Sequence, residues 1–574
     1  MSKLLVAAID FGTTYSGFAF SFAYDYKHDP LQIYLNRWTA GSGFLQSEKT
    51  PTCVLFSPDR KFDSFGYEAE NKYSELALEN KHRPWYYFRR FKMDLYNKEG
   101  ISRSHKIKED GGEKSMDALI IFSASIKYLK EKMVDRCKQQ VTGIEEDDIH
   151  WVLTVPAIWS DPAKQFMREA AVLAGIPSTR LKIALEPEAA SLNCKYLPIE
   201  KNGNIFKPLS KYMVIDAGGG TIDITVHEVQ ENNSLKELYK ANGGAWGGTK
   251  VDEALECLLA DIVGEDVMKA FSKLHKMDYL DLFRDFEYKK RTIKPDLKKD
   301  NLITFKVPTS LTHILSDHKG KRISSTIQSK PKYKEKITWV GDKLRMEANL
   351  TKALFDESCD HIVRHIQSLF RIRQIRDVKT ILLVGGYADS PMLQEAIKAN
   401  FSHVKLIIPP EPALTVLKGA VIFGHEPDAI SSRVCKYTYG VRTYCDFIAN
   451  KHPFEKKILV NGIEKCKDVF SIHVRVGETL RVGEPTASQR YHPLLPDQTK
   501  VRFVIYTSPS SNPEFTSDEG CRRLGSLSID MPDILKGVDR AVNVQMIFSG
   551  TEIEVYATDK DTKKTVKTTV DFLE

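Results

Sequence analysis

Residues 212–226, YMVIDAGGGTIDITV, decide the fold of this chain. An apolar run leads into Asp216, three glycines follow, and a second alternating run returns, as in two strands joined by a tight turn. Successive glycines cost conformational entropy, which is tolerated where the backbone must approach a ligand closely. Their bare N–H groups can form a concavity for phosphate. The stretch therefore predicts a phosphate-binding hairpin, with glycines that serve only the turn as the alternative.

The same pattern stands near the N-terminus. The apolar residues 4–9 lead into DFGTTYSG, residues 10–17, and residues 18–22 are again mostly apolar. Asp10 and Asp216 each close the first strand of their hairpin. Carboxylates beside phosphate-binding turns suit Mg²⁺, which keeps much of its hydration shell and binds next to substrate phosphates. The repetition predicts two related halves, with Asp10 and Asp216 around Mg²⁺.

Strands and helices alternate around both hairpins. A strand over 151–155 precedes a helix over 163–174, and a strand over 381–384 precedes a helix over 391–400. Chains that alternate in this way form α/β folds. The sequence therefore predicts an α/β architecture for this part of the chain.

The pattern changes after Pro427. Turn formers there separate short alternating runs, which are Val469–Val476, Val501–Tyr506, Gly525–Ile529, Val542–Phe548, Glu552–Ala557 and Val566–Val570. Several short strands at such spacing are typical of a β-sandwich. We expect an all-β module in the last part of the chain.

A basic segment lies between residues 317 and 337. Two acids face seven basic side chains there, which are Lys319, Lys321, Arg322, Lys330, Lys332, Lys334 and Lys336. Charge runs of this kind usually form a solvated face. We expect a surface hairpin or loop, with a site for an anionic partner as the alternative.

Composition excludes several classes of function. The 83 basic and 76 acidic residues leave a net charge of +7 over 574 residues, too mild for a nucleic-acid-binding face. No apolar run approaches the roughly 20 residues that span a bilayer, and the N-terminal run is too short for a signal sequence. Nine cysteines without a C-x-x-C pair indicate reduced thiols, not a disulfide framework. We expect a cytoplasmic protein, with the nucleus as a second location, that needs no nucleic acid and has no membrane span.

Several motifs occur in the order that they have in one known family. They are Asp10–Ser16, Val155–Ala157 with Asp161, Glu186–Ala190, Asp216–Asp223, Gly247-Gly248, Glu287–Arg291 and Leu383–Gly386. On these motifs, residues 3–430 resemble the 70-kDa heat-shock protein family, which has the actin-like ATPase fold. Residues 525–529 and 552–561 resemble the β-sandwich substrate-binding domain of that family. The chain is similar to the divergent 12A/12B branch.

The resemblance implies an α/β, actin-like ATPase fold of two related lobes followed by an all-β sandwich domain. Residues 1–430 are the expected nucleotide-binding domain, with lobes of about 1–205 and 206–430. Residues 431–436 are the expected linker. Residues 437–574 are the expected substrate-binding-like domain, without a helical lid.

The resemblance also implies a site for ATP or ADP with Mg²⁺. The residues expected to bind the nucleotide are Gly12, Thr13, Thr14, Tyr15, Gly218, Gly219, Gly220, Thr221, Gly247, Gly248, Glu287, Lys290, Arg291, Gly385, Gly386 and Tyr387. The residues expected in catalysis are Asp10, Lys92, Glu186, Asp216 and Asp223. Asp10 is expected at the metal, and Asp216 and Glu186 are expected to reach it through water. Positioning and charge stabilisation supply most of the catalysis in such phosphoryl transfer.

Two of these assignments have alternatives. Arg90 competes with Lys92 for the place near the γ-phosphate, and a basic helix face would explain both residues. Glu287 is expected at the ribose, and Arg291 presents a flat cation to adenine. A solvated helix face is the alternative for Glu287, Lys290 and Arg291.

The sequence departs from the family pattern at several places. Asp389 stands where a second adenine-stacking arginine is expected, and Tyr387 is the first candidate for a substitute surface. Thr249 replaces an acid, and Lys294 replaces a small hydroxyl residue. Residues 431–436 replace the apolar, acidic linker. We expect a weaker hold on the base and looser coupling between domains.

Three functions are compatible with these features. The first is an atypical, slowly ATP-hydrolysing heat-shock-type chaperone that binds protein or extended-peptide clients through residues 437–574 and works with a nucleotide exchange factor. The second is a nucleotide-dependent protein-binding scaffold with negligible hydrolysis. The third, a sugar kinase, is disfavoured because it has no use for the β module.

Overall fold

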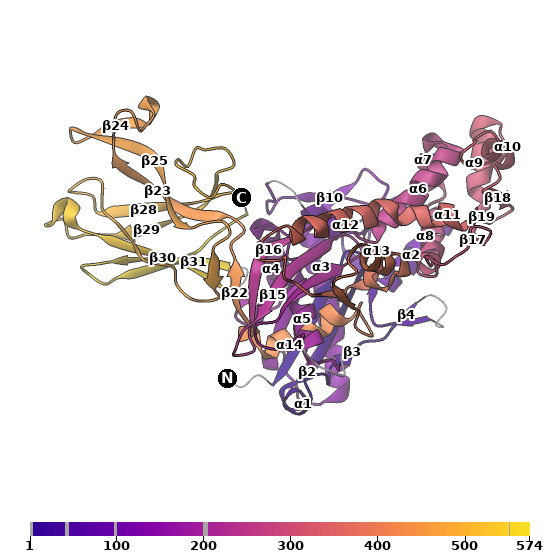
Figure 1. The fold of residues 1–574 in the computed structure, drawn as a ribbon, viewed down its shortest axis with the longest axis horizontal. Coiled ribbons are helices and arrows are strands. Elements are labelled where there is room, and N and C mark those ends of the chain that lie inside the picture. Colours follow the sequence, from indigo (N-terminus) through magenta and orange to yellow (C-terminus); the bar gives the residue numbers. More distant parts are fainter. Residues whose placement is uncertain (1–3, 41–44, 97–99, 199–204, 550–551, 574) are drawn as a thin grey trace.

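The structure is a computed structural model that describes residues 4–40, 45–96, 100–198, 205–549 and 552–573 (Figure 1). Two sheets of matching topology organise its larger part. In the first, β1 (Leu5–Phe11) lies parallel to β12 (Ile149–Val155) and antiparallel to β2 (Tyr15–Phe22). The outer strands of this sheet are β13 (Leu181–Leu185) and β3 (Tyr34–Leu35).

The second sheet repeats this arrangement. Here β14 (Lys211–Ala217) lies parallel to β20 (Thr380–Val384) and antiparallel to β15 (Ile222–Val229). β21 (Lys405–Ile407) and β16 (Leu235–Gly244) flank these strands in the order β21-β20-β14-β15-β16, and the sheet continues beyond β16. Five strands therefore recur with the same order and directions, and the duplication predicted from the two hairpins is present.

Equivalent helices accompany the two sheets. They are α3 (Ala118–Gln140), α4 (Asp161–Leu173) and α5 (Glu186–Tyr196) in the first lobe, and α12 (Asp356–Phe370), α13 (Pro391–Asn400) and α14 (Thr415–His425) in the second. The helices α5 and α14 pack on each other between the sheets. A Cβ on Gly419 would lie 1.7 Å from the carbonyl oxygen of Ala189, so this approach requires glycine. Among the described residues, no helix is both long and apolar enough to cross a bilayer.

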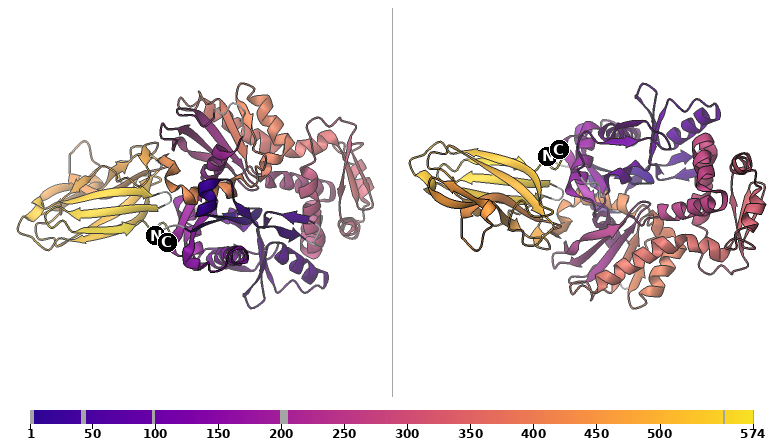
Figure 2. Two further views of the ribbon diagram at one scale, coloured as in Figure 1. Left: turned by 90° about the horizontal axis from the view of Figure 1, so that it is seen from below. Right: turned by 90° about the horizontal axis from the view of Figure 1, so that it is seen from above.

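The second lobe carries a further helical unit at one end of the molecule (Figures 1 and 2). It contains α6 (Thr249–Val263), α7 (Glu265–Leu274), α8 (Lys276–Lys290), α9 (Thr309–Lys319) and α10 (Ile323–Gln328), with β17 (Leu302–Lys306), β18 (Ile337–Val340) and β19 (Lys343–Glu347). The unit includes most of the basic segment, residues 317–337.

The prediction of a surface hairpin or loop for that segment holds for its exposed turns, but the short helix α10 was not predicted. The segment is exposed, but α9 ends and α10 forms within it because Ile327 and Tyr333 are buried in the core of the lobe. Its cations also meet local acids, with Lys319 Nζ 2.7 Å from Asp266 and Lys330 Nζ 2.8 Å from Asp261. These pairs neutralise two of the seven cations of the segment locally.

Two antiparallel sheets form the last part of the chain, called the β domain below. The first has the order β24-β25-β23-β28-β29, with β23 (Thr438–Asp446), β24 (Lys457–Val460), β25 (Ile463–Val474), β28 (Lys500–Ser508) and β29 (Arg522–Asp530). The second has the order β27-β30-β31-β32, with β27 (Gln489–Tyr491), β30 (Val542–Ser549), β31 (Glu552–Asp559) and β32 (Thr565–Thr569). Apolar side chains from both sheets, such as Phe503 and Val555, share one core. In Figure 2 the β domain is a separate body beside the two lobes.

The segment expected as a linker is a strand in the structure. β22 (Ile430–Val434) lies parallel to β16 and antiparallel to β26 (Thr479–Arg481). Arg433 forms a fork on Glu188, with Nε 2.8 Å from Oε1 and Nη2 2.5 Å from Oε2. The Val434 N–H donates to Glu237 Oε2 at 2.8 Å. These buried contacts integrate the segment into the sheet of the second lobe.

The β domain also contacts the first lobe. Tyr439 donates its hydroxyl proton to Asp161 at 2.6 Å, and Arg168 Nε lies 2.8 Å from Glu552. The Phe572 N–H donates to the Gln165 side-chain oxygen at 2.8 Å. Leu573 is buried in the core of the first lobe. The described end of the chain is therefore packed against the first lobe.

We predict that Glu237→Gln flattens the pH dependence of stability. Burial, reinforced by Glu188, raises the pKa of Glu237 from 4.5 to about 8, although Val434 N–H and Arg433 oppose it. Between these two values the folded chain holds a proton that the unfolded chain has lost. Stability contributed by this group is full below pH 4.5 and falls as the pH rises towards 8. A glutamine cannot ionise, and its oxygen can still accept from Val434 N–H.

The measurement is the urea midpoint of the full chain between pH 5 and 8. The variant should gain about 1–3 kcal/mol over the parent at pH 8 and little at pH 5. Glu231→Gln, in an exposed turn, is the matched control. Parallel curves for the parent and Glu237→Gln would contradict the assignment.

Candidate functional site

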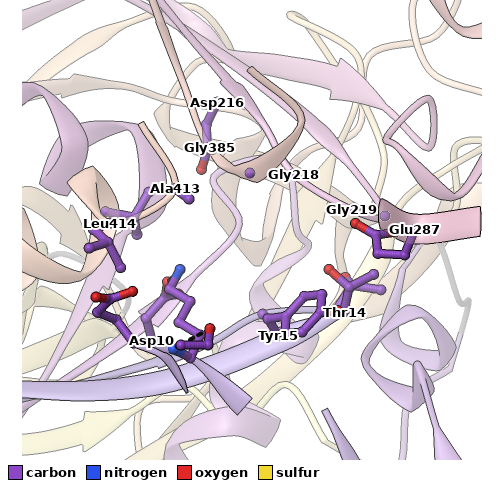
Figure 3. A pocket seen from close by; sticks show the side chains of 18 of the residues that line it. Asp10, Thr14, Tyr15, Asp216, Gly218, Gly219, Glu287, Gly385, Ala413 and Leu414 are labelled. Carbon is purple, nitrogen blue, oxygen red and sulfur yellow. Dashed lines mark hydrogen bonds and ion pairs between the residues drawn. The ribbon is translucent and has the colours of Figure 1, made fainter. Parts of the chain in front are cut away.

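A cavity of about 350 Å³ lies where the two duplicated hairpins face each other. Its volume is in the range of small-molecule sites. Sixteen of the predicted residues line it, which are Asp10, Gly12, Thr13, Thr14, Tyr15, Lys92, Glu186, Asp216, Gly218, Gly219, Gly220, Thr221, Glu287, Arg291, Gly385 and Gly386. Figure 3 shows Asp10 and Asp216 entering the cavity from different sides. The structure thus brings together most residues of the predicted site.

Four carboxylates gather at the inner end of the cavity, where three of them line it and Asp223 lies behind them. Asp10 and Asp216 occupy equivalent positions on β1 and β14, and Asp223 is the cross-strand partner of Asp216 on β15. Glu186 is the first residue of α5. All four residues are at most 9% exposed, so their charges have little access to water.

Two lysines provide the local countercharge. Lys92 Nζ lies 2.6 Å from Glu186 Oε1 and 5.3 Å from the centre of the Trp159 ring. Lys49 Nζ lies 2.6 Å from Asp10 Oδ2. Arg90, the alternative to Lys92, does not line this cavity and pairs with Asp252 at 2.6 Å.

Burial of four acids with only two cations nearby determines the pKa values of the acids. Burial raises the pKa of Asp10, but the Lys49 ion pair, Lys92 and the Thr154 hydroxyl outweigh it and hold the pKa below its usual value. Burial raises the pKa of Glu186 to about 7 in spite of Lys92. Burial and the neighbouring acids raise the pKa of Asp216 well above its usual value, and burial raises that of Asp223. The cluster without its ligand therefore retains protons.

This donor set fits a hard divalent cation. Carboxylate oxygens and water are the ligands that Mg²⁺ prefers, and such an ion would stabilise the ionised form of Asp216, which burial and the neighbouring acids disfavour. Asp10, Asp216 and Glu186 are the residues that could hold it. The excess of buried carboxylates over ammonium groups is the feature of this site that suits a divalent cation.

Backbone hydrogen bonds on the side away from the cavity hold the glycine turn of the second hairpin in place. The carbonyls of Gly218 and Gly219 accept hydrogen bonds from the N–H groups of Gly248 and Thr249, at 3.1 and 2.8 Å. Because the C=O and N–H of a trans peptide point in opposite directions, the amides that follow these carbonyls are turned towards the cavity. Gly385 has φ of +91°, and a Cβ there would lie 2.4 Å from Asp216 Oδ1. This position therefore requires glycine.

The outer end of the cavity combines a charged pair with apolar and aromatic surface. Glu287 on α8 accepts two hydrogen bonds from Arg291, at 2.8 and 3.2 Å. Other lining residues at this end, which the motifs did not indicate, are Tyr67, Tyr288, Ala413 and Leu414. Polar groups next to flat surfaces suit a ribose and a base.

Five predicted residues lie outside the main cavity. Asp223 accepts the Ile158 N–H at 2.9 Å, and Gly247 packs on the backbone of the glycine turn. Lys290 Nζ is held by Glu287 and Asp252, at 2.6 and 2.8 Å. Gly248 and Tyr387 line a smaller neighbouring cavity, where their atoms pack together.

The position of Tyr387 corrects one expectation. Its ring is buried in the core of the second lobe, so it cannot replace the missing stacking arginine from the main cavity. Asp389 is exposed outside the cavity, although its charge interacts with Arg291. Tyr67 and Tyr288 are the aromatic residues that line the cavity.

Lys49 is the main residue that sequence reasoning missed. It precedes β6 (Thr50–Pro51), a two-residue strand paired with β2 next to the Asp10 hairpin. Nothing in the local sequence marks this lysine, because its role follows from pairing with residues more than thirty positions away.

Duplicated lobes around a cavity of acids and glycine turns define a nucleotide-binding protein of the actin-like class. The Hsp70 protein family model matches residues 49–280. The chain is 35% identical to human heat shock 70 kDa protein 12A, over 100% of this chain and 92% of that protein. It is 34% identical to mouse heat shock 70 kDa protein 12A and to human heat shock 70 kDa protein 12B, over 99% of this chain and 92% and 91% of those proteins.

The chain belongs to the 70-kDa heat-shock protein family, in the branch of the 12A and 12B proteins. The resemblance predicted from the motifs is confirmed. Membership implies the actin-like ATPase fold and an ATP-binding protein, with Mg²⁺ as the general cofactor of the family.

We predict that Lys49→Met weakens ATP binding measured without Mg²⁺. Removal of this ammonium leaves Asp10 without its 2.6 Å partner and makes the cavity more repulsive to a triphosphate. A hydrogen bond to a charged group contributes about 1.5–3 kcal/mol, so the loss should be roughly ten-fold or greater. Calorimetry measures it.

Lys61→Met is the matched control because Lys61 pairs with an acid on the exposed surface. Equal ATP affinities of the parent and a folded Lys49→Met variant would show that Lys49 does not face the phosphates.

Proposed function

We propose that the chain is an atypical, slowly ATP-hydrolysing chaperone whose nucleotide state adjusts a client-binding surface on the β domain. The observation that carries this proposal is a continuous connection from the buried acids to the β domain. Asp216 and Asp223 are cross-strand neighbours, and Asp223 accepts the Ile158 N–H at 2.9 Å. The Ile158 carbonyl accepts a hydrogen bond from Lys436 Nζ at 2.6 Å. A change in the protonation or cation binding of the acids can therefore alter the hydrogen bonds of Ile158 and, through them, the position of Lys436 at the start of the β domain.

The chain's residues suit ATP hydrolysis by positioning. Amides of the glycine turn would bind phosphate oxygens, and Lys92 holds Glu186 at 2.6 Å. With its pKa near 7, Glu186 can accept a hydrogen bond from an attacking water and orient it. Mg²⁺, when bound, would neutralise phosphate charge beside Asp10 and Asp216. Positioning and electrostatics of this kind are the main contributions to phosphoryl transfer.

A client surface is available at the outer end of the β domain. Five large apolar side chains are exposed there, which are Tyr444, Ile448, Phe454, Leu459 and Ile463, called the apolar tip below. Phe454 and Leu459 are 78% and 70% exposed. β24 is an edge strand of the five-stranded sheet, and extended peptides can add a strand to such an edge. We propose that the two sheets correspond to the β-sandwich substrate-binding domain of the family and that clients bind at the apolar tip.

A scaffold with negligible hydrolysis is the second candidate. The forked Arg433–Glu188 pair and the packed residues 572–573 favour it, because they fix the β domain on the lobes. Steady-state phosphate release separates the two functions. Turnover that changes peptide affinity supports the chaperone, and nucleotide binding without turnover supports the scaffold.

We predict that Asp216→Asn removes the gain in ATP affinity produced by Mg²⁺. The substitution removes the ionisable group beside the proposed metal position and preserves the shape of the side chain. The fold should survive because a buried carboxyl group that is costly to ionise is replaced by a neutral amide. The loss for Mg-ATP should be about 2–4 kcal/mol, comparable to removal of a stabilising group from a dry site. Calorimetry with and without Mg²⁺, together with phosphate release, measures it.

Asp360→Asn, an exposed substitution on α12, is the control. The assignment fails if the folded Asp216→Asn variant keeps both the parental Mg-ATP affinity and the parental turnover.

We predict that Leu459→Ser combined with Ile463→Ser weakens binding of labelled extended peptides several-fold. Both side chains are exposed on the apolar tip, so their loss removes contact area without opening the core. Fluorescence anisotropy with ATP and with ADP measures the change. Leu535→Ser is the control, because Leu535 is 92% exposed on another loop of the β domain. An equal effect of the control would place the clients elsewhere.

A further inference from the structure

A cysteine pair and a histidine converge below the apolar tip. Cys445 stands near the end of β23, Cys466 is its cross-strand partner on β25, and His452 comes from the segment between β23 and β24. Their sulfur and nitrogen atoms all lie within 4.8 Å of one another. These residues lie in the β domain and are separate from the nucleotide cavity.

The backbone places the two cysteines at a separation that a disulfide can bridge. Directly opposed residues in an antiparallel pair have Cα atoms about 4.5–5.5 Å apart. Disulfides span Cα distances of about 4.4–6.8 Å. Oxidation of Cys445 and Cys466 would therefore need little movement of β23 or β25.

The hydrogen bonds of His452 determine what its ring offers to Cys445. The Ile448 N–H donates to His452 Nδ1 at 3.1 Å, so Nδ1 carries the lone pair of the neutral ring. The ring proton is then on Nε2, which lies 3.9 Å from Cys445 Sγ. The Nε2–H group is therefore placed to donate a hydrogen bond to Cys445 Sγ.

The same tautomer disfavours a metal ion. A metal would need the lone pair of Nε2, and the proton displaced to Nδ1 would then face the Ile448 N–H. Two donors cannot share that contact. The arrangement therefore favours thiol chemistry over coordination.

The two sulfurs differ in access. Cys445 is partly exposed, whereas Cys466 is buried. Burial, with Cys445 as a neighbour, raises the pKa of the Cys466 thiol, and its sulfur lies 3.8 Å from the Lys467 carbonyl as a hydrogen-bond donor. Cys445 is therefore the sulfur that meets a reagent from solvent, and Cys466 is placed to react with the product.

We propose that Cys445 and Cys466 are a reversible dithiol site that exchanges with low-molecular-weight disulfides. The Cys445 thiolate attacks one sulfur of the disulfide, forms a mixed disulfide and releases one thiolate. Cys466 then loses its proton and attacks Cys445 Sγ, which forms the Cys445–Cys466 bond and releases the second thiolate. The protein loses two electrons and two protons, and the small disulfide becomes two thiols.

The test treats the full-length reduced chain with oxidised glutathione and follows it by intact mass and peptide mapping. The expected product lacks two hydrogen atoms, contains a Cys445–Cys466 link and returns to the dithiol with dithiothreitol. Cys466→Ser should trap one glutathione on Cys445, and Cys445→Ser should leave Cys466 unmodified. Cys257, exposed on α6, is the internal reference for an isolated thiol.

Variants of the histidine distinguish a positioned thiolate from simple exposure. His452→Phe should slow modification of Cys445 several-fold relative to Cys257. ATP affinity should remain parental in all three variants, because these residues are outside the nucleotide cavity. A urea transition that matches that of the parent verifies that the β domain of each variant is folded.

Three results would overturn the proposal. One is glutathionylation of Cys257 at least as fast as that of Cys445. Another is failure of the Cys445–Cys466 link to form in the folded chain. The third is stoichiometric zinc in the purified chain that Cys445→Ser removes, which would make this a metal site.

Discussion

Four buried carboxylates that share two ammonium groups are the constraint on which this molecule depends. Lys49 and Lys92 each hold one acid at 2.6 Å, and burial raises the pKa values of the other two acids, Asp216 and Asp223. A buried charge without compensation is costly, so the site is completed by protons or by a cation. The two sheets, the glycine turn and the packed helices α5 and α14 between the lobes all serve to hold these acids at one place. The cation that accompanies a bound nucleotide would supply the positive charge that the two ammonium groups do not provide for the four acids.

The connection between the lobes and the β domain depends on the same acids. Ile158 contributes its N–H to Asp223 and its carbonyl to Lys436, so a single residue touches both parts of the molecule. Around it, a charged fork, a tyrosine–aspartate hydrogen bond and the packed residue Leu573 provide further contact. Such a junction can transmit a conformational change from the lobes to the β domain, or it can hold the two parts in one fixed arrangement. The balance between these two behaviours separates a chaperone from a scaffold.

Local patterns in the sequence predicted the elements that carry their own signals. The acid-led hairpins, the strand over 151–155 and the helix that follows it are all present, because apolar runs and glycine turns are read over a few residues. Lys49 and β22 could not be predicted in this way, since each depends on partners in distant segments. The same holds for Tyr387, whose burial depends on how the second lobe packs. In the basic segment, two buried apolar side chains outweighed the charge pattern.

The position of β22 has a consequence for how the chain can be divided. A fragment that ends at residue 430 would remove two strands, β22 and β26, from the seven-stranded sheet and leave Glu188 without Arg433. Glu237 would lose the Val434 N–H at the same cut. The isolated ATP-binding part should therefore extend through Lys436, whose ammonium group also supports the Ile158 carbonyl. A boundary placed at the end of the last helix would divide one folded unit. Low stability or low ATP affinity of such a fragment would then result from the missing segment and would not describe the intact chain.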